Sequence, residues 1–332
     1  MALVQTSTVR NPRRGSATPF RGRAPSEVAY STALGRMYLG QSDELLKAGA
    51  FKRFEGRVNL IFTSPPFPLN RKKKYGNEVG QQYIDWLCSF GPLLKSLLAK
   101  DGSIVIEMGN SWESGSPVMS TLAMKALIEF QERNSLQLCQ EFIWQNPARL
   151  PTPAQWVNIE RIRVKDSFTK LWWLSPIANP KANNRRVLRD YSSSMKSLLA
   201  RGKYNAGSRP SQHSIGERSF LKNNSGAIPS NVLTFANTHA NDPYQSFCRE
   251  QGISLHPARM PIELAKFFIN FLTEPRDLVF DPFGGSNTTG AAAETLDRHW
   301  FSVEAHAPYV RGSLGRFMSS LRLDRTESMP SV

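Results

Sequence analysis

The stretch VNLIFTSPPF, from Val58 to Phe67, decides the fold. It begins with a short apolar run, which is typical of a strand buried on both faces of a parallel sheet. It ends in Ser64-Pro65-Pro66-Phe67, where each proline lacks a backbone N–H and holds the preceding residue in an extended conformation. The strand therefore stops abruptly at its carboxyl end, and ligands bind at this edge of an open α/β sheet.

The Ser64-Pro65-Pro66-Phe67 turn suits the recognition of an amino group. A serine hydroxyl and a carbonyl that the sheet leaves free are two hydrogen-bond acceptors at a fixed separation. The exocyclic NH₂ of a nucleobase has two N–H bonds that match them, and holding both would free the nitrogen lone pair for attack. Phe67 could stack on the base. The alternative is a Pro-Pro turn that only ends a strand.

A second strand end lies far downstream in LVFDPFGGSNTTG, from Leu278 to Gly290. A short strand ends at Asp281, and a glycine-rich turn leads into a helix whose first amides favour a carboxylate. Glu304 ends the next expected strand about 20 residues after the glycines, the usual place of a ribose-hydroxyl acceptor. This pattern predicts a nucleotide-cofactor site, with a plain tight turn as the alternative. The pattern G-x-G-x-x-G is absent, which argues against NAD.

Together, these stretches resemble the DNA amino-methyltransferases that use S-adenosylmethionine. The S-P-P-F form resembles the cytosine-N4 branch, and the order, with the catalytic turn first and the cofactor loop last, is similar to the permuted beta group. The resemblance runs from about Met37 to the C-terminus. Besides the two turns, it includes RKKKYGN at 71–77, NPARLPTPAQWVN at 146–158, RIRVKD at 161–166, RPSQHSIG at 209–216 and HPARMP at 256–261.

The resemblance implies an α/β fold, with a doubly wound, mostly parallel methyltransferase sheet of permuted order and an inserted DNA target-recognition domain. The composition changes at about Ser175, and residues 185–222 carry nine cations and two acids, for which a disordered linker is the alternative. We expect four regions, which are a disordered basic arm at 1–30, the catalytic half of the methyltransferase domain at 31–175, the target-recognition domain at 176–255 and the cofactor-binding half at 256–325.

The resemblance also assigns the site residues. Ser64 and Pro65 would hold the target amino group. Pro66 would keep the shape of the turn, and Phe67 would stack on the base. Asp281 would bind the ammonium group of the cofactor, and Gln41 stands where the family usually has an Asp that meets the adenine. The full set of predicted cofactor residues is Gln41, Asp281, Phe283, Gly284, Gly285, Ser286, Asn287, Thr288, Gly290 and Glu304. The predicted DNA contacts are Arg71, Lys72, Lys73, Lys74, Arg209, Gln212 and His213.

The composition supports a phosphate-rich partner. The chain carries 42 Lys and Arg against 27 Asp and Glu, a formal net charge of +15, which favours salt-sensitive binding to nucleic acid. No apolar run is long enough to cross a membrane. Three distant cysteines indicate neither a disulfide framework nor a metal site. The cysteines fit a reducing cytoplasm, and the resemblance implies a prokaryotic or phage-encoded protein that acts as a monomer on double-stranded DNA.

The predicted reaction is direct methyl transfer from S-adenosylmethionine to the N4 nitrogen of a cytosine flipped out of the duplex, without a metal or a covalent intermediate. The enzyme would work beside a cognate restriction endonuclease or as an orphan methylase. An adenine-N6 methyltransferase is the alternative within the class. A non-catalytic nucleic-acid-binding protein on a methylase scaffold is the alternative outside it. Glu107, at the end of an expected strand over 103–107, is left open between a site residue and an ordinary strand-end acid.

Overall fold

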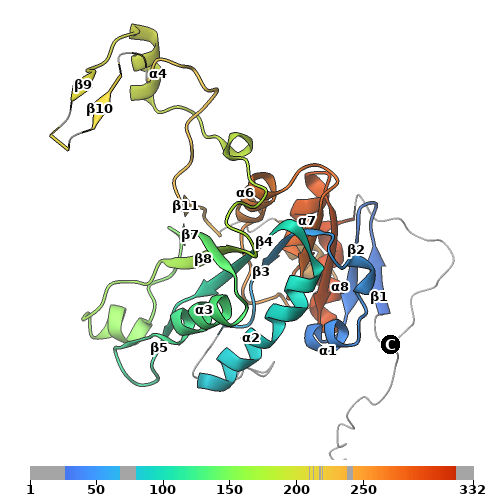
Figure 1. The fold of residues 1–332 in the computed structure, drawn as a ribbon. Helices are drawn as coiled ribbons and strands as arrows, with labels where there is room; N and C mark the ends of the chain where they lie inside the picture. Colours follow the sequence, from blue (N-terminus) through green and yellow to red (C-terminus); the bar gives the residue numbers. More distant parts are fainter. Residues whose placement is uncertain are drawn as a thin grey trace, which may run out of the picture.

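The computed structural model describes residues 27–67, 80–208, 210, 211, 213–216, 218, 220–237 and 242–318. Among them, a nine-stranded sheet in the order β1-β2-β13-β12-β3-β4-β8-β7-β11 forms the centre of the molecule (Figure 1). These strands are β1 (Glu27–Ser31), β2 (Gly35–Leu39), β3 (Val58–Thr63), β4 (Leu98–Gly109), β7 (Gln137–Gln145), β8 (Phe168–Ser175), β11 (Val232–Thr234), β12 (Leu278–Asp281) and β13 (His299–Glu304).

The five neighbouring strands β2, β13, β12, β3 and β4 run parallel to one another. β8 and β7 continue the sheet in antiparallel pairing from β4, β11 then pairs parallel to β7, and β1 pairs antiparallel to β2. The predicted mostly parallel sheet is therefore confirmed. The permuted order is visible in it, because β3 and β12 are adjacent although they lie in opposite halves of the chain.

The chain leaves β3 and β12 in opposite directions. From β3 it crosses through α2 (Gly80–Leu97) to β4, and from β12 it crosses through α7 (Thr288–Thr295) to β13 on the other side. Two adjacent parallel strands whose connections diverge leave a crevice outside their carboxyl ends, which is where doubly wound sheets bind ligands.

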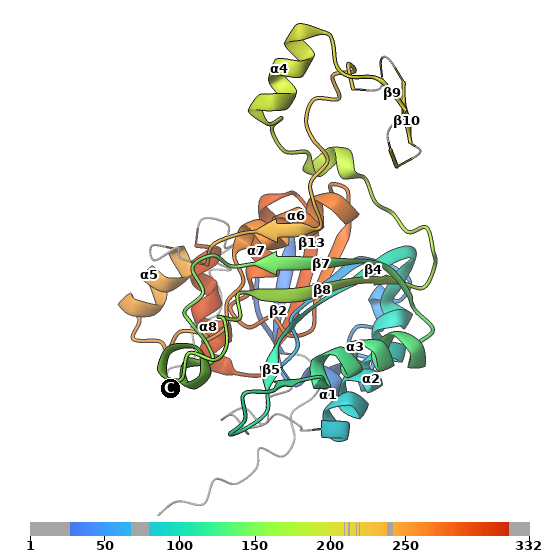
Figure 2. The ribbon, with the colours of Figure 1, turned by 90° about the vertical axis from the view of Figure 1, so that its left-hand side faces the viewer.

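Helices cover both faces of the parallel strands (Figures 1 and 2). The first face carries α2 with α1 (Ser42–Lys47) and α3 (Leu122–Arg133), and the opposite face carries α7 with α6 (Ile262–Leu272) and α8 (Ala307–Ser313). Ile61 of β3 packs into the first core, whereas Leu60 and Phe62 pack into the second. Because successive side chains of a strand alternate between faces, a strand buried on both sides needs the unbroken apolar run seen in the sequence.

Part of the inserted region protrudes from this body (Figure 2). It contains α4 (Ser193–Arg201) and the short strands β9 (Gly207–Ser208) and β10 (Ser214–Ile215), whereas η3 (Asn184–Val187), just before it, packs against α6. At its base, the backbones of Arg189 and Ala227 exchange two hydrogen bonds of 3.0 and 2.8 Å. We call the region from Arg189 to Ala227 the protruding module.

The predicted domain boundaries differ from the structure at two places. The range 176–255 is divided, because β11 joins the main sheet and α5 (Pro243–Glu250) packs against η4 (Leu314–Arg316). Residues 27–30, predicted as part of a disordered arm, lie in strand β1, and the rest of that arm is outside the described residues.

The remaining short elements are η1 (Lys52–Phe54), β5 (Ser111–Trp112), β6 (Met119–Ser120) and η2 (Gln155–Ile159). In the described ranges, no helix is long and apolar enough to cross a membrane.

Candidate active site

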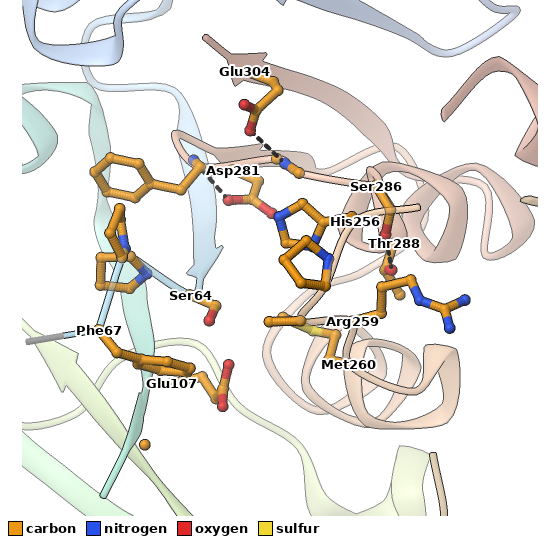
Figure 3. A pocket seen from close by; sticks show the side chains of 18 of the residues that line it. Ser64, Phe67, Glu107, His256, Arg259, Met260, Asp281, Ser286, Thr288 and Glu304 are labelled. Atoms are coloured by element: carbon orange, nitrogen blue, oxygen red, sulfur yellow. Dashed lines mark hydrogen bonds between the residues drawn. The ribbon is translucent and has the colours of Figure 1, made fainter. Parts of the chain in front are cut away.

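A cavity of about 930 Å³ lies outside the carboxyl ends of the parallel strands (Figure 3). It is lined by the turn after β3, by Glu107 of β4, by the turn after β12 and by Glu304 of β13. The hydroxyl of Thr63 donates a hydrogen bond of 2.7 Å to Asp281, which ties the two central strand ends together. The fold thus brings the two predicted halves of the site, which are far apart in the sequence, into one cavity.

Asp281 is buried at the centre of this strand edge. Its carboxylate accepts hydrogen bonds from the hydroxyls of Thr63 and Thr289, both at 2.7 Å, and from the backbone N–H of Phe283 at 3.0 Å. Burial raises the pKa of Asp281 to about 6, although these hydrogen bonds oppose the rise. The carboxylate is therefore ionised at neutral pH, and a cationic group bound beside it would offset its loss of solvation.

The turn after β12 is fastened to Glu304. One carboxylate oxygen of Glu304 accepts from the backbone N–H of Gly285 at 2.9 Å, and the other accepts from that of His306 at 2.8 Å. Burial raises the pKa of Glu304, and the backbone N–H groups partly oppose the rise. Gly285 has φ of +52°, and an added Cβ would lie 3.0 Å from the His256 ring, so the turn requires glycine at this position.

Most of the predicted cofactor residues line the cavity, and two do not. Gln41, Phe283, Gly284, Gly285, Ser286 and Thr288 line it together with Asp281 and Glu304. Asn287 is fully buried behind the turn, where its side-chain oxygen accepts from the backbone N–H of Gly290 at 3.2 Å and from Ser302 at 2.9 Å. It has φ of +53° and caps α7. In this geometry Asn287 and Gly290 shape the turn without facing the cavity.

The catalytic turn faces an acid that the sequence leaves open. The Ser64 hydroxyl lies within hydrogen-bonding reach of the Glu107 carboxyl group, whose residue is only 5% exposed. Burial raises the pKa of Glu107 to about 7, while the Ser64 hydrogen bond and the charge of Arg149 oppose the rise. The structure thus places Glu107 in the site. The sequence signal for it is an acid at the carboxyl end of a strand.

Phe67 forms a wall at the same end of the cavity (Figure 3). A Cβ on Gly109 of β4 would lie 3.3 Å from the Phe67 ring, so the ring rests on a strand surface that has no side chain. Ser64, Glu107 and the Phe67 ring together offer a hydroxyl, a carboxyl group and a flat aromatic face. This combination fits a planar ring that carries an amino group.

Trp86 and Phe90, which form an aromatic wall with the predicted residue Phe283, were not predicted as part of the site. The Phe283 ring lies 5.6 Å from that of Trp86 and 5.2 Å from that of Phe90, and all three residues line the cavity. Trp86 and Phe90 belong to α2, where apolar residues at helical spacing are expected simply to fill the core. Aromatic faces of this kind suit a purine ring.

Six of the seven predicted DNA contacts lie outside the described residues. They are Arg71, Lys72, Lys73, Lys74, Arg209 and Gln212. His213 is described, and it is exposed on the protruding module next to β10, away from the cavity lining. Among the residues that the structure describes, no group of three or more His, Cys, Asp or Glu side chains is placed to hold a metal ion.

Comparisons with known proteins agree with this geometry. Residues 58–314 match the family model for DNA methylases of the N6/N4 type. The chain is 43% identical over 294 residues to the type II methyltransferase M.PvuII of Proteus hauseri, covering 88% of this chain and 86% of that protein. A solved structure of the cytosine-N4-specific PvuII DNA methyltransferase superimposes with a TM-score of 0.70 at 38% identity, covering 91% of this chain and 90% of that one. An M1.HpyAVI–SAM complex shares the fold, with a TM-score of 0.51 at 19% identity over 86% of this chain and 99% of that chain.

Proposed function

This chain belongs to the N6/N4 family of DNA methylases, and on that premise we propose that it methylates the exocyclic N4 of cytosine in duplex DNA with S-adenosylmethionine. The observation that carries the proposal is the meeting of the Ser64-Pro65-Pro66-Phe67 turn and the Asp281–Glu304 region in one cavity. The relative at 43% identity and the cytosine-N4-specific structure support the choice of base.

The residues of the cavity fit the proposed cofactor. Glu304 is a carboxylate at the end of β13 and would accept from the two ribose hydroxyls. Asp281 would hold the ammonium group, and the amides of the glycine turn would hold the carboxylate. The wall of Phe283, Trp86 and Phe90 would lie against the adenine. When bound, the cofactor supplies an electrophilic methyl group on its sulfonium sulfur.

The other end of the cavity fits the proposed acceptor. In this proposal Ser64 would donate its hydroxyl hydrogen to Glu107, which would leave the oxygen lone pairs free to accept an N–H bond from the cytosine amino group. A backbone carbonyl of the proline turn would accept the second N–H bond, and the Phe67 ring would stack on the base. Holding both N–H bonds directs the nitrogen lone pair toward the methyl group.

Glu107 would also receive a proton. The amino nitrogen gains a bond to carbon when it attacks, so one of its protons must leave. A carboxyl group with a pKa of about 7 can take up that proton near neutral pH, because its affinity for the proton is matched to the working pH. With the base bound as proposed, the Ser64 hydroxyl would lie between the base and Glu107 and would relay the proton.

The remaining expectations complete the proposal. The net charge of +15 supports binding to the phosphates of duplex DNA. Arg209, Gln212 and His213 are our candidates for reading base edges, and residues 71–74 are our candidates for phosphate contacts. We propose that the protein works as a cytoplasmic monomer of a prokaryote or phage, either beside a cognate restriction endonuclease or as an orphan methylase.

Nucleoside analysis of cellular DNA tests this function. DNA from cells that express the chain should contain N4-methylcytosine by mass spectrometry, and cells that express Ser64→Ala at the same level should contain almost none. N6-methyladenine would favour the alternative reaction, and the absence of both bases would refute catalysis. Sequencing that detects modified bases would then give the recognised site.

A further inference from the structure

Leu150 has an unusual environment for a large aliphatic side chain. It lines the cavity, yet it is 76% exposed, so it stands at the mouth of the cavity. Exposure of a leucine at one point of a surface is common. A leucine fixed at the entrance of an active site calls for an explanation, because this is the position that a substrate must pass.

The backbone on both sides of Leu150 is held in place. The backbone N–H of Arg149 donates to the carbonyl of Asn146 at 3.2 Å, and the ammonium group of Lys165 donates to the carbonyl of Arg149 at 3.4 Å. The Arg149 guanidinium donates to the carbonyl of Phe168 at 3.1 Å. Pro151 follows with a fixed φ. The loop therefore presents the leucine side chain from a defined position.

The rest of this loop, residues 147–166 between β7 and β8, carries charges that suit DNA. It contains four cations, Arg149, Arg161, Arg163 and Lys165. Its two acids already accept hydrogen bonds within the protein, Glu160 from Gln155 at 2.8 Å and Asp166 from Asn110 at 2.9 Å. An apolar side chain in a loop with four cations matches a duplex better than it matches an apolar protein partner.

We propose that Leu150 enters the base stack of the duplex and fills the place that the target cytosine leaves when it turns into the cavity. This inference rests on the proposed function, since only a flipped base can reach Ser64. Flipping a base removes its stacking and pairing, and an apolar side chain inserted between base steps replaces part of the lost contact. Leu150 would therefore act on the extrusion of the base and not on methyl transfer to a base already in the cavity.

Single-turnover methylation of two duplexes tests this role. Both carry the recognised site, but in one the target cytosine faces guanine and in the other it faces an abasic position, so that it is already unpaired. With the paired duplex, Leu150→Ala should be slower than the wild type by roughly tenfold or more, since unpairing and unstacking a base costs a few kcal/mol. With the unpaired duplex, the two rates should agree within about twofold, because little remains for the wedge to do.

Two further variants serve as controls. Leu150→Met keeps the volume and apolar character of the side chain and should stay close to the wild type on both duplexes. Val164 lies in the same loop and is 87% exposed, but it is not among the residues that line the cavity. Val164→Ala should therefore methylate both duplexes at the wild-type rate.

Three results would overturn the role of Leu150. They are an unchanged rate of Leu150→Ala on the paired duplex, an equal loss on both duplexes, and a loss in Val164→Ala that matches that of Leu150→Ala. If the wild type methylates cytosine in neither duplex, the proposed function fails first and this inference fails with it. The wild-type measurement therefore distinguishes failure of the proposed function from failure of the proposed role of Leu150.

Discussion

The two strand ends that meet at the centre of the sheet are built differently. The end of β12 is held by side chains, because Asp281 accepts three hydrogen bonds and Glu304 on the neighbouring strand accepts two from backbone N–H groups. The end of β3 is shaped by Pro65 and Pro66, and its one reactive group, the Ser64 hydroxyl, faces the same cavity as Glu107. One turn is therefore fastened by its carboxylates, and the other by its backbone.

This difference predicts different effects of substitution. At the cofactor turn, the carboxylates that would bind the ligand also satisfy the backbone, so their loss should lower both ligand affinity and stability. At the catalytic turn, the prolines keep the shape of the chain whatever the Ser64 side chain is. Substitution there should change the rate of reaction and leave the fold intact.

The largest effect is expected for Ser64→Ala. The hydroxyl is proposed to hold an N–H bond that becomes more acidic as the nitrogen attacks, so its loss should slow methyl transfer by about 10²–10³-fold. Single-turnover assays with tritiated cofactor measure this rate, and thermal melting with calorimetric cofactor titration checks that fold and affinity are unchanged. A wild-type rate in the folded variant would remove Ser64 from the mechanism.

Glu107→Gln should give the next largest effect, a loss of about 10²-fold if the group accepts the proton. The wild-type rate should rise as pH increases through about 7, where Glu107 ionises, and the variant should lose this step. The pKa of Glu107 is higher in the folded protein than in the unfolded chain. Its contribution to stability is therefore full at low pH and lost as pH rises through about 7, so the variant should be more stable than the wild type in alkaline buffer. A rate profile of unchanged shape would exclude Glu107 as the proton acceptor.

Glu304→Ala should have a smaller effect that differs in kind. Cofactor affinity should fall by about 1.5–3 kcal/mol, the range for hydrogen bonds to a charged group, as measured by calorimetric titration. The unliganded protein should also melt at a lower temperature, because Gly285 and His306 lose the acceptor of their N–H groups. Glu304→Gln keeps an acceptor and should recover much of the stability but not the affinity. If cofactor affinity fell but the melting temperature of the unliganded protein did not, Glu304 would not stabilise the cofactor turn, and the proposed difference between the two turns would be wrong.

The smallest effect is expected for the segment that precedes β1 in the chain. Removal of residues 1–26 leaves β1 complete and deletes five arginines, Arg10, Arg13, Arg14, Arg21 and Arg23. The single-turnover rate at saturating DNA should stay close to that of the full chain, while DNA affinity should fall less steeply with salt. Filter binding at several salt concentrations measures the slope. Loss of methylation in a folded truncation would show that the segment is part of the site.

Both turns can be predicted from the sequence, because each follows a buried strand and contains either prolines, which restrict the backbone, or glycines, which free it. Glu304 is predicted from its spacing to the glycines of the second turn. Asn287 and Gly290 show the limit of this reasoning, since a sequence pattern does not say whether a side chain of a turn faces the ligand or caps the helix behind it. Here Asn287 has its hydrogen bonds to Gly290 and Ser302.

Other features depend on contacts that no local pattern reveals. The raised pKa of Glu107 results from its burial in the folded protein, and the aromatic wall requires α2 to lie against Phe283. The end of the inserted domain is missed because β11 has only three residues and therefore little periodicity. Its place in the sheet is fixed by its pairing with β7 and by the bond from Asn231 to the carbonyl of Glu141 at 2.9 Å.

The adjacency of β3 and β12 has a consequence for how this protein is made. Thr63 and Asp281 are bonded neighbours but are separated by 218 positions in the chain. At a synthesis rate of 5–20 residues per second, β3 leaves the ribosome roughly 10–40 seconds before the strand that covers its edge. During that interval an apolar strand has an open edge, which is the feature that promotes aggregation in nascent chains. The permuted order therefore delays closure of the sheet until nearly the whole chain exists, and efficient production should depend on chaperones that shield β3.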